Sequence, residues 1–420
     1  MDQKLLKRTA GNSVLLMIFM LIFSAYVTKE NTPGIVMAGN EEAFEETSLV
    51  GVEENEEEPE EAPEPLPQQD PVSMEEEMVA KMGDRYLIIP KNGSLGNAEL
   101  SIDEDYLYKV ITLKATGVNK LTWDNMCVRR YNEGREFTGE ADTAHLEVYK
   151  DEYLYDDEEP ADLDTIDAED LKIENEEKEG PEDLVRAVNI EYDEASEIAK
   201  MSLTTDHLYI PVLYEDDANY YIDLKKPKEV YDKIVVFDAG HGGKHPGTMS
   251  NDRKYLEKDF NLEIIKKIKE KFDAQTDIKV FYTRMDDSSV YLLPRVTLAN
   301  EAQADYFVSV HNNAYYNKWA YGTEVLYNEL LETKGNVDSK ELATLLLNEV
   351  VGRLNNRNRG LRMGSTTFII GHSQVPVALL ELGYLTNPDD LAMLQDEKNI
   401  ELIADGIYTA ILKAYEEEGK

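Results

Sequence analysis

The chain has 420 residues, and this length predicts two folded units joined by linkers rather than one compact domain. Apolar residues make up 42% of it, enough for buried cores, while a formal net charge of −42 without clusters of Lys and Arg excludes nucleic acid as a partner. The single cysteine, Cys127, excludes an intrachain disulfide, so we expect the fold to depend on packing or on a metal ion.

The first 30 residues carry the charge pattern of an export segment. Lys4, Lys7 and Arg8 precede an uncharged apolar run at residues 14–27, as in exported proteins. This run is shorter than the ~20 residues of a full membrane span. No small-residue cleavage site follows closely, so a cleaved signal peptide and a retained membrane anchor both remain open. We expect an exported protein that touches the membrane only if residues 1–30 are retained.

An acidic linker is predicted at residues 31–82. Residues 41–80 contain sixteen Asp or Glu, five prolines and no Lys or Arg. Such a segment repels itself and has little apolar surface to bury, so we expect it to be an extended, disordered spacer. A second acidic run, at residues 151–184, is predicted to be a loop within the next domain.

Residues 83–229 are predicted to form a smaller, β-rich domain. Three stretches alternate apolar and polar residues with Tyr, Val and Ile enriched: 108–113 (YKVITL), 187–192 (AVNIEY) and 218–224 (ANYYIDL). This period of two is typical of strands with one solvent-facing side. The end of this domain, 220–225 (YYIDLK) followed by Pro227, is similar to the end of wall-targeting β-sandwich domains. This similarity implies a wall-binding role, while an unrelated spacer or partner-binding domain remains open.

Residues 230–420 are predicted to form an α/β domain, a sheet covered by helices, because apolar strand-like runs alternate with amphipathic helical segments. The first run is apolar throughout, as in strands buried on both faces. The predicted strands are 233–238, 279–283, 306–310, 322–327 and 377–380, and the predicted helices are 259–274, 293–303, 339–354 and 400–415.

Four chemically reactive side chains lie at the ends of these strands or in the first loop. His241 follows the first strand, His311 ends the third, Glu381 ends the last, and Glu257 precedes the first helix. Because reactive residues in such sheets collect beyond the carboxyl ends of strands, we expect the four to lie together. Two imidazoles and a carboxylate around one open position make a catalytic zinc site, and a further carboxylate can take a proton from metal-bound water.

The local sequence around two of these residues supports the hypothesis. Gly240, Gly242 and Gly243 flank His241 and permit the tight backbone turns that a loop around an ion requires. Glu381 lies in an apolar run, where an unpaired carboxylate would cost several kcal/mol and therefore needs a metal, a cation or a proton. Pairing of Glu381 with a surface Lys or Arg remains the alternative.

This region resembles the zinc-dependent N-acetylmuramoyl-L-alanine amidases called amidase type 3, which hydrolyse peptidoglycan. The resemblance extends over about 180 residues and rests on seven segments in order. They are 235–243 (VVFDAGHGG), 256–262 (LEKDFNL), 282–287 (YTRMDD), 295–300 (RVTLAN), 304–314 (ADYFVSVHNNA), 322–327 (GTEVLY) and 376–387 (PVALLELGYLTN).

The resemblance implies a mixed sheet of about six strands and one zinc ion per catalytic domain. It implies that His241, Glu257 and His311 are the zinc ligands and that Glu381 is the catalytic acid and base. Peptidoglycan is then the partner, cut at the amide between the muramic acid lactyl group and L-alanine. The sequence departs from the family at His245, where Asp is usual, and at Asn312, where Ala is common. His245 as an alternative ligand, and substrate contact by His372, remain open.

Two other classes of function remain open at this stage. Another zinc hydrolase of the cell wall, a peptidase or a deacetylase, could use the same four residues on a different bond. A non-catalytic wall-binding protein could keep the domain with a vestigial site, although candidates for all four roles are present.

Overall fold

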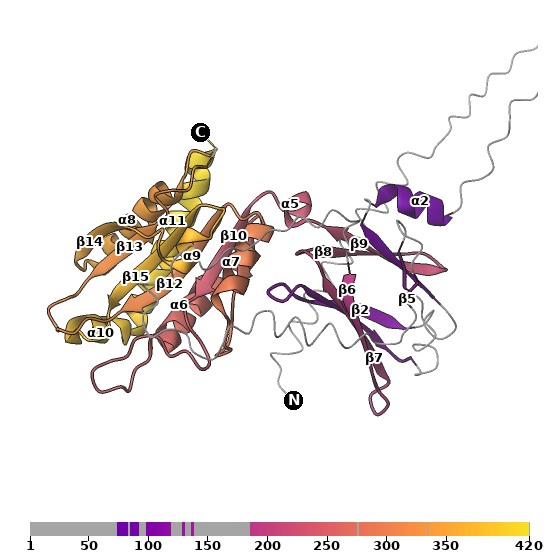
Figure 1. Ribbon diagram of the computed structural model, residues 1–420, viewed down its shortest axis with the longest axis horizontal. Coiled ribbons are helices and arrows are strands. Elements are labelled where there is room, and N and C mark those ends of the chain that lie inside the picture. The colour runs from indigo at the N-terminus through magenta and orange to yellow at the C-terminus, as the bar shows by residue number, and fades with distance from the viewer. Residues whose placement is uncertain are drawn as a thin grey trace, which may run out of the picture. The chain divides into compact units, whose positions relative to one another are not determined.

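The computed structural model describes residues 74–82, 85–91, 98–118, 128–130, 136–137, 185–274, 277–333 and 335–419. These residues belong to one compact unit, Gln69–Lys420, drawn as coloured ribbon in Figure 1. The predicted export segment, most of the predicted linker, Cys127 and the acidic run 151–184 lie outside the described residues. Within the described ranges, no helix combines the length and apolar character needed to cross a membrane.

The end of the predicted acidic linker is helical, so the prediction of disorder up to residue 82 is wrong for its last residues. Helix α2 spans Met74–Lys81. Met78, Val79 and the following Met82 pack against a small cluster that includes Tyr86 and Ile88. The apolar spacing at positions 78, 79 and 82 supplies a helical face, and burial of that face outweighs the repulsion of three preceding glutamates.

Two antiparallel sheets follow, with strand orders β5-β4-β1-β9-β8 and β2-β3-β7-β6. Their bounds are β1 Tyr86–Pro90, β2 Glu99–Asp105, β3 Val110–Thr116, β4 Val128–Arg130, β5 Glu136–Phe137, β6 Val185–Asp193, β7 Ile198–Thr205, β8 Ile210–Glu215 and β9 Asn219–Lys225. The three predicted strand segments lie largely in β3, β6 and β9.

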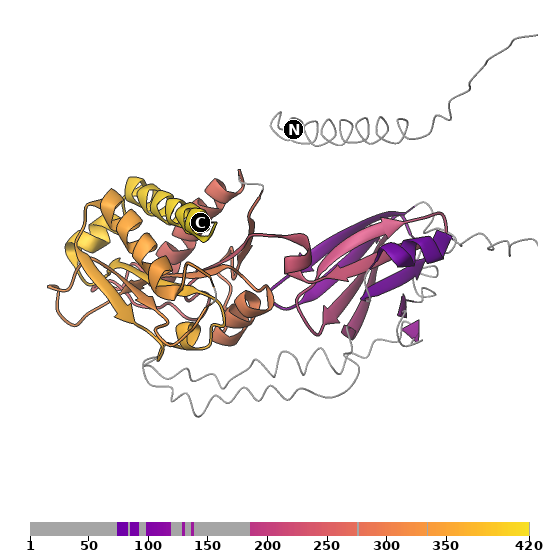
Figure 2. The same ribbon diagram turned by 90° about the horizontal axis from the view of Figure 1, so that it is seen from above.

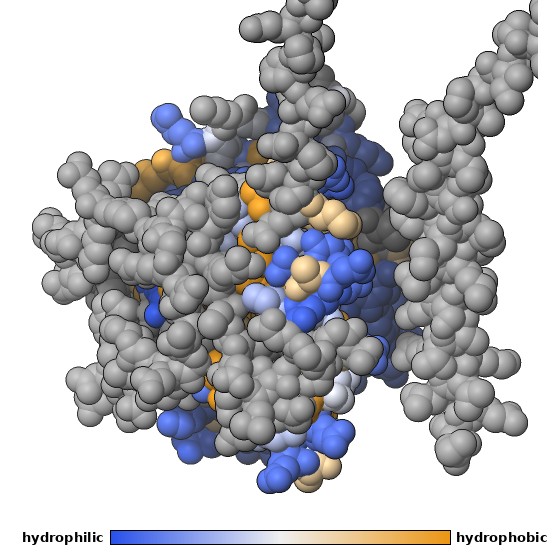
Figure 3. Space-filling view, turned by 90° about the vertical axis from the view of Figure 1, so that its right-hand side faces the viewer, coloured by the Kyte–Doolittle hydropathy of each residue, from blue (hydrophilic) through white to orange (hydrophobic). Residues whose placement is uncertain are grey.

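The two sheets share one core. Leu87 of β1 and Ile222 of β9 in the first sheet cluster with Leu113 of β3 and Met201 of β7 in the second. Burial alternates along β3, as expected for a strand with one face in a core. The surface seen in Figure 3 is mainly hydrophilic between the grey atoms, with a few small hydrophobic patches. The limits of residues 83–229 as a separate domain remain a prediction.

The carboxy-terminal part is an α/β domain built on a mixed six-stranded sheet, as predicted. The order is β11-β10-β12-β15-β13-β14, where β13 runs antiparallel to β15 and every other neighbouring pair is parallel (Figures 1 and 2). The strands are β10 Ile234–Ala239, β11 Lys279–Tyr282, β12 Tyr306–Asn313, β13 Thr323–Tyr327, β14 Asn358–Met363 and β15 Val377–Tyr384.

Helices cover both faces of this sheet. The helices in this part of the chain are α5 Pro227–Val230, α6 Glu257–Phe272, α7 Leu292–Glu301, α8 Ser339–Leu354, α9 Phe368–Gly371, α10 Pro388–Leu394 and α11 Glu397–Glu418. The apolar faces of α6, α8 and α11 pack on one side, and those of α7 and α9 pack on the other. All six residues of β10 are buried as a result, which confirms that this apolar run is covered on both faces.

The sheet topology brings the predicted reactive residues to one edge. β10, β12 and β15 are parallel, so their carboxyl ends meet there. His241 follows β10, His311 is in β12, and Glu381 is in β15. Glu257 is the first residue of α6, which returns to the sheet from the loop after β10.

Candidate metal centre and active site

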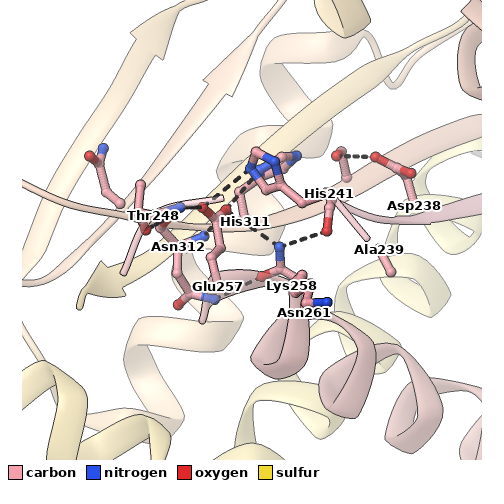
Figure 4. A network of polar contacts seen from close by, with 12 residues as sticks. Asp238, Ala239, His241, Thr248, Glu257, Lys258, Asn261, His311 and Asn312 are labelled. Atoms are coloured by element: carbon pink, nitrogen blue, oxygen red, sulfur yellow. Dashed lines mark hydrogen bonds and ion pairs between the residues drawn. The ribbon is translucent and has the colours of Figure 1, made fainter. Parts of the chain in front are cut away.

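Three side chains from three elements converge on one point. Figure 4 shows His241, Glu257 and His311 pointing toward one another. Nε2 of His241 lies 3.2 Å from Oε2 of Glu257, and Nδ1 of His311 lies 2.9 Å from Oε1 of the same carboxylate. One ligand atom from each residue can be chosen so that all lie within 4.8 Å of one another. The structure thus brings together the three residues expected to be ligands.

The donor set fits a zinc ion. Zinc in catalytic sites takes three nitrogen or carboxylate ligands in a tetrahedral arrangement with one position open. With bond lengths near 2.1 Å, donor atoms in such a site lie about 3.4 Å apart. The measured separations of 2.9 and 3.2 Å are close to that spacing. The two imidazole rings are nearly perpendicular, at 78°, with centroids 4.9 Å apart, so both can direct a nitrogen at one ion.

Glu257 is the most constrained of the three. Its Oε2 accepts a hydrogen bond from the backbone N–H of Thr248 at 2.7 Å, and its Oε1 accepts one from the backbone N–H of Asn312 at 2.9 Å. Burial alone would raise the pKa of Glu257, but hydrogen bonds and charge interactions with His241 and His311 lower it below its ordinary range. The carboxylate is therefore held ionised, as a metal ligand must be.

Two glycines leave room for the ligand side chains. A Cβ atom added at Gly240 would overlap the imidazole ring of His311. A Cβ added at Gly247 would lie 2.5 Å from Oε2 of Glu257 and 2.6 Å from Cδ2 of His241, and Gly247 also has a positive φ of 66°. These positions need glycine because the backbone passes directly against the ligands. Of the two, only Gly240 was singled out from the sequence.

Two buried arginines hold the loop that presents His241. Arg295 donates to the carbonyl oxygens of Ala239 and His241, both at 2.8 Å. Arg284 donates to Ala239 at 2.8 Å and to Gly240 at 2.9 Å. His241 itself adopts a positive φ of 60°, a costly conformation for a residue other than glycine. The arginine contacts to neighbouring carbonyls keep the backbone in that conformation.

Asp238 is the buried counter-ion of this arrangement. Its Oδ1 accepts hydrogen bonds from Arg295 and from the hydroxyl of Thr283, and its Oδ2 accepts one from Ser309, all at 2.6 Å. Burial raises the pKa of Asp238, but the positive charge of Arg295, with smaller contributions from His311 and the two hydroxyl donors, outweighs it. The pKa falls from its ordinary value of 3.8 to about 2.

We expect Asp238→Asn to lower the free energy of unfolding by about 3–5 kcal/mol at neutral pH, because Arg295 would stay buried without its counter-ion. Urea unfolding of the full chain measures this. A depressed pKa contributes stability above pH ~4 that is lost as the pH falls toward 2, so the difference between variant and parent should shrink over that range.

The matched control for this prediction is Asp405→Asn. Asp405 lies 2.6 Å from Lys271 on the surface, where Lys271 also keeps Glu401 as a partner. The Asp405 side chain is 45% exposed, and a pair with one member open to solvent contributes only about 0–1 kcal/mol. Equal losses in the two variants would contradict the importance assigned to the buried pair.

Glu381 lies beside the candidate metal centre. It is paired in register with His311 on β12 and with Glu324 on β13, so the three side chains fall in one row across the sheet. Two arginines lie next to Glu324 at the end of this row. Glu324 accepts a hydrogen bond from Arg359 Nε at 2.9 Å, and its carboxylate lies 3.0 Å from Arg362 Nε. The register therefore places a carboxylate next to the candidate ligand His311, and the catalytic role of Glu381 remains a prediction.

The other candidate residues have different surroundings. The backbone of His245 forms an antiparallel β-bridge with that of Gly242. His245 is not part of the candidate metal-binding group found among the described residues. His372 stacks on Phe368 at 4.2 Å, and its Nδ1 lies 3.0 Å from the Phe368 carbonyl oxygen, a local contact after α9. Asn312, the other departure from the family, is buried, and its Nδ2 donates to Asn261 Oδ1 at 2.8 Å. Its side chain therefore takes part in the hydrogen bonds that surround the candidate ligands.

Sequence reasoning assigned no role to several supporting residues: Asp238, Arg284 and Arg295, which hold the loop, and Asn261. Asn261 donates to the Gly240 carbonyl at 3.1 Å, beside the ligands. The available signal was a charged residue inside an apolar segment, as Arg295 is in LLPRVTLAN. A buried charge needs a buried partner, but the sequence does not say which acid supplies it.

Comparison with known proteins places the same region in a family. Residues 235–413 match the family model described as N-acetylmuramoyl-L-alanine amidase. Over 185 residues the chain is 35% identical to the uncharacterized protein YqiI of Bacillus subtilis (strain 168), a match that covers 86% of YqiI and 44% of this chain. The chain belongs to the N-acetylmuramoyl-L-alanine amidase family. The resemblance carried by the seven sequence segments is thereby confirmed.

Two further members of the amidase family show the extent of the match. The amidase LytC of Bacillus subtilis (strain 168) is 30% identical over 192 residues, which are 46% of this chain and 37% of LytC. The crystal structure of N-acetylmuramoyl-L-alanine amidase from Clostridium difficile 630 is 35% identical, covers 44% of this chain and 97% of that chain, and has a TM-score of 0.41. Family membership implies hydrolysis of an amide bond, and each of these matches covers less than half of the chain.

Proposed function

We propose that this protein is a zinc-dependent N-acetylmuramoyl-L-alanine amidase. It hydrolyses the amide between the lactyl group of muramic acid and L-alanine in peptidoglycan. The observation that supports this most is the convergence of His241, Glu257 and His311 within 4.8 Å, with Glu381 in register beside His311. The choice of this amide as the bond that is cut rests on the match to the amidase family.

The residues of the site divide the work. His241, Glu257 and His311 would hold the zinc ion, which when bound would act as a Lewis acid that polarises water and the scissile carbonyl group. The Glu381 carboxylate takes a proton from the attacking water. As the carbonyl carbon gains the water oxygen and its bond to nitrogen breaks, Glu381 passes the proton to the departing L-alanine nitrogen. The products are a free lactyl carboxylate on the glycan and a stem peptide with a free amino terminus.

Mass analysis of digested peptidoglycan tests this proposal. The full chain, incubated with purified cell wall and Zn²⁺, should release stem peptides that begin with L-alanine and leave glycan strands with free lactyl groups. Internal peptide cuts would favour a peptidase, and loss of acetyl groups would favour a deacetylase. A chelator should stop the release and added Zn²⁺ should restore it. Release of no product under any condition would favour a non-catalytic wall-binding protein.

We also propose that the protein acts outside the cell, exported through residues 1–30. The proposal rests on the basic leader and apolar run at that end of the sequence and on the cell-wall substrate. Fractionation of producing cells should find the chain with the wall or the membrane. Recovery only from the cytoplasm would contradict it, and amino-terminal sequencing of the recovered protein separates a cleaved signal from an anchor.

A further inference from the structure

The loop between β12 and β13 exposes an unusual number of aromatic rings. Tyr315, Tyr316, Trp319 and Tyr321 are 46%, 87%, 75% and 43% exposed. They are four of the eleven large hydrophobic side chains exposed in the described residues, and they fall within seven consecutive positions. Single exposed apolar residues are ordinary, but a group of this kind commonly marks a binding surface. We call residues 314–321 the aromatic loop.

The aromatic loop is tied to the strands that carry the site. The backbone N–H of Tyr315 donates to Thr386 Oγ1 at 3.0 Å, and Asn387 Nδ2 donates to the Lys318 carbonyl at 2.6 Å. Tyr315 is four residues after His311, and Thr386 is five residues after Glu381. The rings are therefore held at the same edge of the sheet as the candidate active site, on a backbone fixed by hydrogen bonds.

The charge of the aromatic loop differs from that of the whole chain. Its sequence, AYYNKWAY, contains one lysine and no acid, in a protein with a formal net charge of −42. The Lys318 ammonium lies 5.7 Å from the Trp319 ring centroid, and the Arg357 guanidinium lies 4.9 Å from that of Tyr321. The aromatic loop therefore presents no carboxylate of its own to an acidic polymer of the cell wall.

We propose that the aromatic loop binds the glycan strand of peptidoglycan, by stacking its rings on sugars next to the muramic acid that is cut. This inference rests on the proposed function and names a second contact for the same substrate. Pyranose rings have apolar C–H faces and hydroxyl edges, which suit exposed Tyr and Trp rings with their own polar groups. A lipid surface fits less well, because the loop has no aliphatic side chain larger than alanine and only one basic residue.

Binding and turnover together test the proposal. Trp319→Ala and Tyr316→Ala are each compared with the parent in two measurements. The first is binding to glycan strands without stem peptides, followed by sedimentation. The second is kcat/KM, determined on long peptidoglycan strands and on a single disaccharide-peptide unit. We expect each variant to lose about tenfold in glycan binding and in kcat/KM on long strands, the size of one stacking contact. Activity on the single unit should stay within about twofold, because that substrate lacks the neighbouring sugars.

Control variants separate stacking from general damage. Trp319→Phe keeps an aromatic ring and should recover most of the binding, and Leu330→Ala removes a side chain that is 76% exposed outside the loop and should change nothing. Equal glycan binding by parent and Trp319→Ala would overturn the proposal. The same two proteins are also sedimented with anionic lipid vesicles, and a variant that binds vesicles less well than the parent but glycan equally well would overturn it too. If the parent cuts no substrate, the proposed function fails, while the sedimentation result still decides the role of the loop.

Discussion

Glu381→Gln is expected to bind zinc as the parent does and to lose about 10²–10⁴-fold in turnover, the contribution of a positioned acid and base. Glutamine keeps the size and shape of the side chain, but it cannot accept the proton of the attacking water. Glu381 is the carboxylate proposed for this role, because it lies in register with the candidate ligand His311 on the neighbouring strand. Metal analysis and release of stem peptides from cell wall are measured on the same sample.

Glu324→Gln is the matched control for this prediction. It removes a carboxylate from the same row of the sheet, on the neighbouring strand, but one that is buried against Arg359 and Arg362. We expect it to unfold at a lower temperature, because two guanidinium groups lose their common acid, and to keep most of its turnover when folded. A Glu381→Gln protein with full activity would show that another group moves the proton.

The strands of the catalytic sheet could be predicted from the sequence where both faces are buried. The short apolar runs in β10, β12 and β15 are typical of strands covered on both faces, and nearly all of their residues are buried in the sheet. The edge strand β14, NRGLRM, was not predicted. Its pairing with β13 is made by the backbone. None of its six residues is fully buried, and apolar and polar residues do not alternate along its whole length, so the sequence shows no sustained period of two.

The candidate ligands could be selected from the sequence because their chemistry is visible in single residues. His241 and His311 each lie at a predicted strand end, and Glu257 precedes the first predicted helix; the resemblance to a family selects the same residues. The supporting contacts could not be predicted in the same way. The pair formed by Asp238 and Arg295 joins residues 57 positions apart, and only the fold shows that their side chains meet.

The helix α2 shows how composition can mislead. The acidic, proline-rich sequence before it predicts disorder, and the prediction extended over Met74–Lys81 as well. Those eight residues form a helix whose Met78 and Val79 contact a core cluster that includes Tyr221, more than 100 positions later. Repulsion between neighbouring acids disfavours the helix, and packing against an apolar surface far away in the sequence stabilises it. Local sequence patterns do not reveal that surface.

His311→Ala is expected to abolish both metal binding and amidase activity. The imidazole is one of the three proposed ligands, and its loss leaves Glu257 with a single imidazole neighbour, His241. Loss of an outer contact in such sites costs 10–100-fold in metal affinity, so loss of a ligand should cost more. Zinc content after dialysis, and competition with a chelator, measure the affinity, while circular dichroism shows whether the sheet is intact.

His245→Ala is the control that the chain itself offers. His245 lies in the same loop as His241, four residues later, but outside the group of side chains that converges on one point. The variant should bind one zinc per chain with the affinity of the parent and keep its activity. If His245→Ala lost zinc while His311→Ala kept it, the ligand set would include His245, and the role given to the register between β12 and β15 would have to be revised.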